Sequence, residues 1–332
     1  GLLQSKREDG SGYLKVNVAR TRWFTAQLKL EGAVYRFSGL FNAGGAFRAK
    51  LKRGGVEVLV ELSFTGANAA PRIAGVIAAD GRLYSMNAAP AIYSTAVPAP
   101  QQGRYTVLVQ PDPGTYPSPQ FPQGYGYATM RVSASGSVKL VGKLGDLQPF
   151  SSSSLLKDGA LFPLYASLYK KPFGSVAGEL AFTQNSALSD FEGTLLWIKP
   201  AQPAGVHPEG FSMKAVPVIG SRYVAPSKGT RALDWNAGSG HLTLKEGYLS
   251  TVLNAQLTLS LLNKLSVESS DAARLTVSIS PSTGWFQGSF IHPFTEANVR
   301  FAGALFQAGK SAGGAFICAD QSGMVTMSVC PP

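Results

Sequence analysis

Apolar and polar residues alternate along most of the chain. Residues 13–18 read Tyr-Leu-Lys-Val-Asn-Val and place Leu14, Val16 and Val18 on one face. Residues 138–144 and 273–279 alternate in the same way, and Gly, Asn, Asp or Pro bound such runs. A period of two is typical of strands with one buried face. Because no helical crossover segments separate these runs, we predict an all-β fold of antiparallel strands.

Internal repetition divides the chain. The pair Trp23-Phe24 and a following Arg-Phe-Ser-Gly run recur as Trp285-Phe286 and Arg-Phe-Ala-Gly. A fainter copy at residues 126–132 matches residues 12–18. We therefore predict three related β-meanders that begin near residues 1, 103 and 250, in units 1–102, 103–225 and 226–332.

Glycines in the repeats predict closure of the sheets. Gly39 and Gly303 occupy equivalent repeat positions, and a glycine within a strand permits sharp coiling. The meanders are thus expected to close into tandem β-barrels or sandwiches. The spacing leaves open whether these are separate barrels or one continuous barrel.

Composition excludes two classes of protein. Of 332 residues, 45% are hydrophobic and 10% aromatic, which excludes intrinsic disorder. No apolar run reaches about 18 residues, the length that a membrane-spanning helix needs.

The two cysteines, Cys318 and Cys330, fit no zinc motif. They are either a disulfide that ties down the last strand or two buried free thiols.

Several runs resemble a known bacterial module. They are residues 126–132, 142–146, 156–169, 285–293 and 300–307. These runs are similar to the C-terminal β-rich repeat region of large secreted multidomain bacterial surface proteins, whose upstream parts often hold Ig-like or other adhesion-type modules. The resemblance implies export and an extracellular or cell-surface location, and it brings no catalytic residues.

Catalytic and metal-binding patterns are missing from the sequence. There is no Gly-x-Ser-x-Gly elbow, and the three histidines lack metal-ligand spacing. Residues 234–240 superficially resemble a calcium loop, but Ser239 and Lys245 stand where Gly and Glu are normal. We therefore predict a hairpin turn there, no metal and no cofactor. A glycosidase would need two opposed carboxylates, and the candidates are Asp158, Glu179, Asp190, Glu192, Asp234 and Glu246.

Positive charge is concentrated near the start. Residues 1–54 carry a net charge of +8 out of +11 for the whole chain. The predicted basic patch comprises Arg20, Arg22, Arg48, Lys50, Lys52 and Arg53. Such a patch either attracts anionic polysaccharide, lipopolysaccharide or nucleic acid, or discourages the pairing of a strand edge. The second interpretation is favoured, and no nucleic-acid-reading fold accompanies the charge.

Aromatic residues offer a candidate sugar platform, because flat rings stack on the apolar faces of pyranoses. Trp235, between Asp234 and Asn236, is predicted to be the most exposed, and Tyr116, Tyr125 and Tyr127 form a second candidate patch. In each Trp-Phe pair of the repeat, one ring is expected to face the core and the other to face outward.

The leading functional prediction is a non-catalytic extracellular structural or adhesive β-module of a larger bacterial surface protein. Its partner would be another surface protein or a polysaccharide, with no membrane span. A carbohydrate-binding module that uses exposed aromatics is the second interpretation, and a polysaccharide-active hydrolase is the third.

Overall fold

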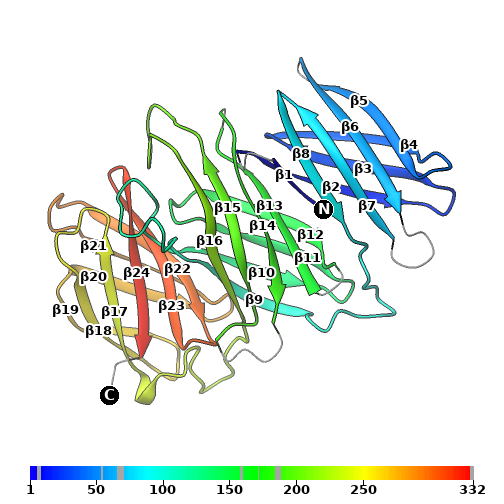
Figure 1. The fold of residues 1–332 in the computed structure, drawn as a ribbon. Helices are drawn as coiled ribbons and strands as arrows, with labels where there is room; N and C mark the ends of the chain where they lie inside the picture. The colour runs from blue at the N-terminus through cyan, green and yellow to red at the C-terminus, as the bar shows by residue number, and fades with distance from the viewer. Residues whose placement is uncertain are drawn as a thin grey trace.

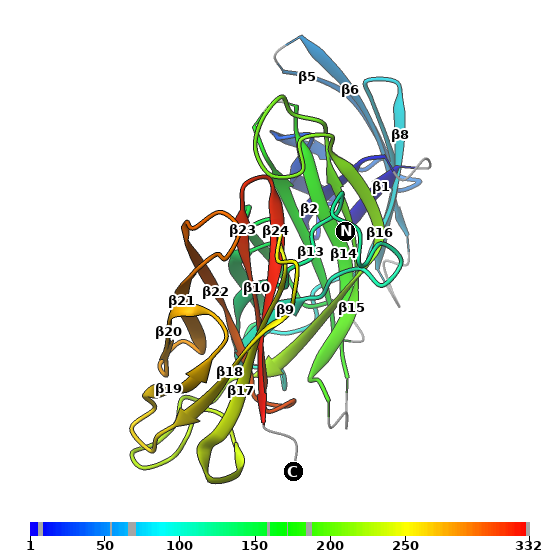
Figure 2. The ribbon, with the colours of Figure 1, turned by 90° about the vertical axis from the view of Figure 1, so that its left-hand side faces the viewer.

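In the part of the chain that the structure describes, the strands form three antiparallel sheets of eight strands each. The computed structural model describes residues 1–5, 9–53, 55–65, 71–157, 160–170, 172–183 and 188–329. Each sheet curls into a nearly closed barrel, and the barrels follow one another in chain order (Figures 1 and 2). The predicted all-β antiparallel fold is confirmed, and the barrels are separate rather than continuous. No helix in the described residues is long and apolar enough to cross a bilayer.

Barrel A is the N-terminal sheet. Its strands are β1 (Leu2–Ser5), β2 (Ser11–Val18), β3 (Trp23–Leu30), β4 (Ala33–Leu40), β5 (Ala46–Arg53), β6 (Val56–Thr65), β7 (Arg72–Ala79) and β8 (Arg82–Ala88). The first strand pairs with the last, at Gln4↔Ser85. The sheet therefore ends at β4 and β5, which are consecutive in the chain but unpaired with each other.

Barrel B repeats this plan. Its strands are β9 (Gly103–Val109), β10 (Gly126–Val132), β11 (Ser137–Lys143), β12 (Pro149–Leu155), β13 (Leu161–Leu168), β14 (Gly174–Phe182), β15 (Phe191–Lys199) and β16 (Phe211–Arg222). Strands β9 and β16 pair, and the sheet ends at β12 and β13.

Barrel C follows a short 3-10 turn at Asn236–Gly238. Its strands are β17 (Ser239–Glu246), β18 (Leu253–Leu259), β19 (Leu265–Ser270), β20 (Ala273–Ser280), β21 (Trp285–Ile291), β22 (Asn298–Phe306), β23 (Ser311–Cys318) and β24 (Gln321–Val329). Here the sheet ends at β19 and β20, one strand earlier than in the other two barrels.

The repeated residues do not occupy the same strand position in the two barrels that contain them. Trp23 begins the third strand of barrel A, whereas its repeat equivalent Trp285 begins the fifth strand of barrel C. The third meander was expected to begin near residue 250, but β17 already begins at Ser239. The repeated residues thus specify a local hairpin, while the pairing of first and last strands sets the position of that hairpin in its barrel.

Each barrel encloses its own apolar core. In barrel A, Phe24 lies at the centre of an aromatic group with Phe37, Phe41 and Phe47. Phe37 of β4 and Phe47 of β5 stack with their ring centres 6.2 Å apart. The seam of barrel A is therefore spanned inside by aromatic rings, without a backbone ladder between the two strands.

Candidate binding surfaces

Trp235, predicted to be the most exposed tryptophan, is buried. Only 2% of its surface is accessible, and its indole Nε1 donates a hydrogen bond to the carbonyl of Lys310 at 2.8 Å. The ring lies in the core of barrel C and passes over Gly240, where a Cβ would meet it at 2.5 Å. The flanking Asp234 and Asn236 are polar, but the turn directs the indole into the barrel, so the prediction of exposure was wrong.

The tyrosine patch lies at the junction of barrels B and C. Tyr127 is 1% exposed and packs edge-on against Trp285, with ring centres 5.5 Å apart. The amide of Tyr125 donates to the carbonyl of Gly314 at 3.1 Å. The hydroxyl of Tyr116 donates to Glu246 at 3.0 Å. These side chains join two barrels rather than forming a flat platform, and burial raises the pKa of Tyr127 to about 12.

Further polar contacts tie barrel B to barrel C. The backbone amide of Gln123 donates a hydrogen bond to the Ser322 hydroxyl at 2.9 Å, and His207 Nε2 lies 3.2 Å from the same oxygen. The hydroxyl of Ser221 accepts a hydrogen bond from the amide of Ala308 at 3.0 Å. An apolar cluster that includes Tyr127 and Phe306 also joins the two barrels, so they form one packed unit.

Barrel A contacts barrel B through a smaller interface. Tyr13 of β2 packs with Tyr165 and Ala177 of barrel B. The hydroxyls of Ser11 and Ser175 are 2.7 Å apart, and both residues are buried. A pocket of about 680 Å³ opens beside this contact.

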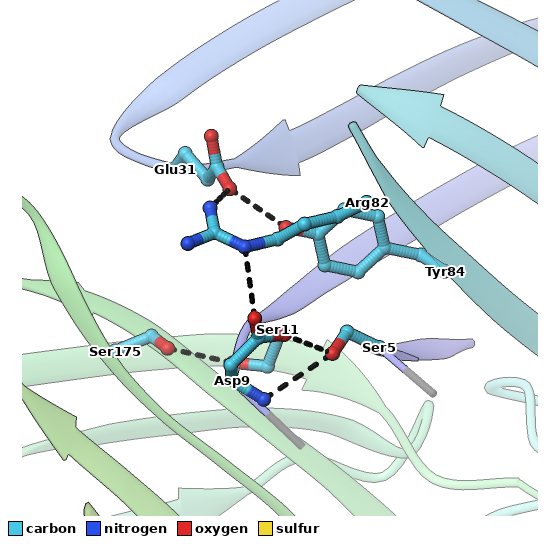
Figure 3. A network of polar contacts seen from close by, with 7 residues as sticks. All are labelled: Ser5, Asp9, Ser11, Glu31, Arg82, Tyr84 and Ser175. Atoms are coloured by element: carbon cyan, nitrogen blue, oxygen red, sulfur yellow. Dashed lines mark hydrogen bonds and ion pairs between the residues drawn. The ribbon is translucent and has the colours of Figure 1, made fainter. Parts of the chain in front are cut away.

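A charged network closes the end of barrel A that faces this pocket (Figure 3). Arg82 of β8 donates to Glu31 at 2.7 Å and to Asp9 at 3.3 Å. The Tyr84 hydroxyl also donates to Glu31, at 2.7 Å. Although burial opposes the charge on Arg82, Glu31 holds the pKa of that guanidinium above its usual range. Burial raises the pKa of Tyr84, and Ser5 lowers that of Asp9. The network links three strand ends, and nothing in the sequence pattern singled it out.

The opposite end of barrel A carries an exposed apolar pair. Trp23, the first residue of β3, and Leu40, the last of β4, are direct cross-strand partners and are 50% and 52% exposed. Arg20 and Arg22 lie exposed in the adjoining turn, and Arg22 donates to the carbonyl of Asn42 at 3.1 Å. We call these four residues (Arg20, Arg22, Trp23 and Leu40) the distal patch. Phe24 is buried, so one ring of the pair faces the core and the other faces outward, as predicted.

The remaining residues of the predicted basic patch lie along β5, an edge strand. Arg48 pairs with Glu61 at 3.0 Å, and Lys50 and Lys52 pair with Glu57 at 3.1 and 3.5 Å. Arg53 lies at the far end and lines the pocket between barrels A and B. The six cations therefore share one barrel but not one site.

The acids considered for hydrolysis are largely engaged elsewhere. Glu179 pairs with Lys157, and Asp234 pairs with Lys310. Asp190 accepts a hydrogen bond from the amide of Arg222 at 2.6 Å. Glu192 is exposed on the outside of barrel B, and Asp158 lies outside the described residues. Within the described ranges, no three His, Cys, Asp or Glu side chains gather to hold a metal ion.

Cys318 is buried with a free thiol. Its predicted partner, Cys330, lies outside the described residues. The disulfide between the two therefore remains a prediction.

Comparison with known proteins does not assign the chain to a family. No family model matches the chain, and no curated protein matches it. Among solved structures, a double mutant of Transferrin Binding Protein B from Haemophilus parasuis Hp5 aligns with 97% of this chain and 66% of its own, at 10% identity and a TM-score of 0.23. Intact Ap-TbpB aligns with 98% of this chain and 67% of its own, at the same identity and TM-score. A likeness this weak carries no argument about function.

Proposed function

We propose that the chain is a non-catalytic extracellular module of a larger bacterial surface protein, and that it binds a partner protein through the distal patch. In this proposal barrels B and C form the support, and barrel A presents the patch at the end that faces away from barrel B.

The exposed Trp23–Leu40 pair is the observation that carries the proposal. Both residues lie on paired strands, so their backbone is held in place by the sheet. Tryptophan and arginine are the residues that most often dominate protein–protein binding energy. The distal patch contains both residue types, since the half-exposed Trp23 lies beside Arg20 and Arg22. The sugar-binding alternative is weaker, because Trp235 and Tyr127, two of its four aromatics, are buried.

A binding panel tests this proposal. The full chain is immobilised and challenged at physiological salt with purified extracellular proteins and with neutral and anionic polysaccharides. We expect a protein ligand whose affinity falls at least tenfold in Trp23→Ser and in Leu40→Ser. The matched control is Leu262→Ser, since Leu262 is a highly exposed leucine of barrel C. Binding that is unchanged in Trp23→Ser, or that is confined to polysaccharides, would overturn the proposal.

A further inference from the structure

The seam of barrel A exposes two strand edges. Strands β4 and β5 end the sheet, and within the described residues no ladder joins them. An unpaired edge presents a row of backbone N–H and C=O groups that an extended chain can bond. Many natural peptide-binding domains use such edges to add a strand.

Hydrogen bonds at the strand ends show which groups face the seam. The amide of Phe64 donates to the carbonyl of Gly45, one residue before β5 begins. Because bonding alternates along an antiparallel pair, Phe47, Ala49 and Leu51 bond to β6. The backbone groups of the intervening Arg48, Lys50 and Lys52 therefore point into the seam.

The same alternation orients β4. The amide of Phe41 donates to the carbonyl of Arg22, just beyond the β3–β4 ladder. Arg36, Ser38 and Leu40 consequently direct their backbone groups away from β3 and toward the seam. In agreement, the guanidinium of Arg53 reaches across from β5 to the carbonyl of Val34.

Charge limits what can pair with this edge. The outward side chains of Arg36, Arg48, Lys50 and Lys52 flank the seam, and all four are exposed. The three cations of β5 form ion pairs with Glu57 and Glu61 of β6, and these exposed pairs contribute little. A second copy of β5 would bring like charges face to face, which disfavours pairing between copies.

We propose that the β5 edge of barrel A binds an extended acidic segment of a partner protein by strand addition. Residues directly opposite one another in a sheet share a face. Acidic residues of the segment would lie opposite Arg48, Lys50 and Lys52. The residues between them would point inward, beside Phe47, Ala49 and Leu51. The segment that fits therefore alternates acidic and apolar residues over about six positions, and it differs from the ligand of the distal patch.

Backbone hydrogen exchange in the full chain tests the geometry first. In the free protein the amides of Arg48, Lys50 and Lys52 exchange fast, and those of Phe47, Ala49 and Leu51 exchange slowly. The probe is a labelled peptide, Thr-Val-Glu-Val-Glu-Val-Glu-Thr, and its control carries Gln in place of Glu. On adding the probe, we expect protection to appear at the three fast amides. Slow exchange at those three amides in the free chain, or no new protection, would overturn the proposal.

A proline variant separates strand addition from charge attraction. Lys50→Pro removes an N–H that faces the seam and leaves the β5–β6 ladder intact, because edge strands tolerate such a proline. Lys50→Ala loses the same charge but keeps the N–H. We expect peptide affinity to be at least tenfold weaker in Lys50→Pro than in Lys50→Ala, and Leu262→Ser to bind like the wild type. Equal affinities of the two Lys50 variants, with displacement by heparin, would overturn strand addition and indicate unspecific anion binding.

Discussion

At the scale of single residues, two tryptophans have opposite environments. Trp235 fills the core of barrel C, whereas Trp23 is half-exposed on barrel A. Trp235→Ala should therefore lower the free energy of unfolding by about 3–5 kcal/mol, since it opens a large cavity. Trp23→Ala should lower it by less than about 1 kcal/mol. Denaturant unfolding of both variants measures the difference, and equal losses would contradict the assignment.

His207 should make the protein sensitive to acid. Burial lowers the pKa of its imidazole from 6.5 to about 4. The unfolded chain therefore binds a proton between these values that the folded chain does not, and stability falls as the pH falls through this window. From pH 7.5 to pH 5 the loss from this group is about 2 kcal/mol.

The variant His207→Gln isolates this effect. Glutamine can still hydrogen-bond to the Ser322 hydroxyl, which lies 3.2 Å from His207 Nε2, but it does not titrate. Unfolding free energies of the two proteins at pH 7.5 and pH 5 should show a smaller pH-dependent loss in His207→Gln. Equal losses would show that other groups determine the acid sensitivity.

At the scale of elements, the repeated glycines can be tested directly. A Cβ at Gly303 would approach the carbonyl oxygen of Gly313 to 2.2 Å, and one at Gly39 would approach the ring of Phe47 to 2.3 Å. A side chain at the seam can shift more easily than a paired backbone. We expect Gly303→Ala to lower the free energy of unfolding by about 1–3 kcal/mol, and Gly39→Ala to cost less. The reverse order would contradict the open seam.

Strand type and strand pairing differ in how far the sequence predicts them. Alternation at residues 13–18 and 138–144 predicts strands correctly, because side-chain period depends only on neighbouring residues. The position of a strand within its barrel is not determined by its local sequence. The repeat aligns Trp23 with Trp285, yet the strands that they begin hold different positions, since closure depends on which strand pairs with the first.

The exposure of the candidate aromatic residues could not be predicted from the local sequence pattern either. The polar residues on either side of Trp235 suggested that its ring points outward, and Tyr116, Tyr125 and Tyr127 suggested a second patch for sugar. Both segments instead pack against residues far away in the sequence, as when Tyr127 meets Trp285. The Arg82–Glu31 pair joins residues 51 positions apart, and the alternation of either strand gives no sign of it.

At the scale of the whole molecule, the two junctions should differ in strength. Barrels B and C share an apolar cluster and several buried hydrogen bonds, whereas barrel A meets barrel B at a smaller contact. We expect two thermal transitions in calorimetry, one for barrel A and one for the B–C unit. Arg82→Ala should lower only the first, and Tyr127→Ala only the second. A single transition that both variants lower would contradict this division.

The most direct test of the account compares two variants in one binding experiment. Trp23→Ser alters the distal patch of barrel A, and Tyr116→Ala alters the tyrosine group at the B–C junction. The account predicts that binding of the protein ligand at physiological salt falls at least tenfold in Trp23→Ser and is retained in Tyr116→Ala. Loss of binding in Tyr116→Ala with retention in Trp23→Ser would contradict the account. It would show that the binding site lies at the junction of barrels B and C.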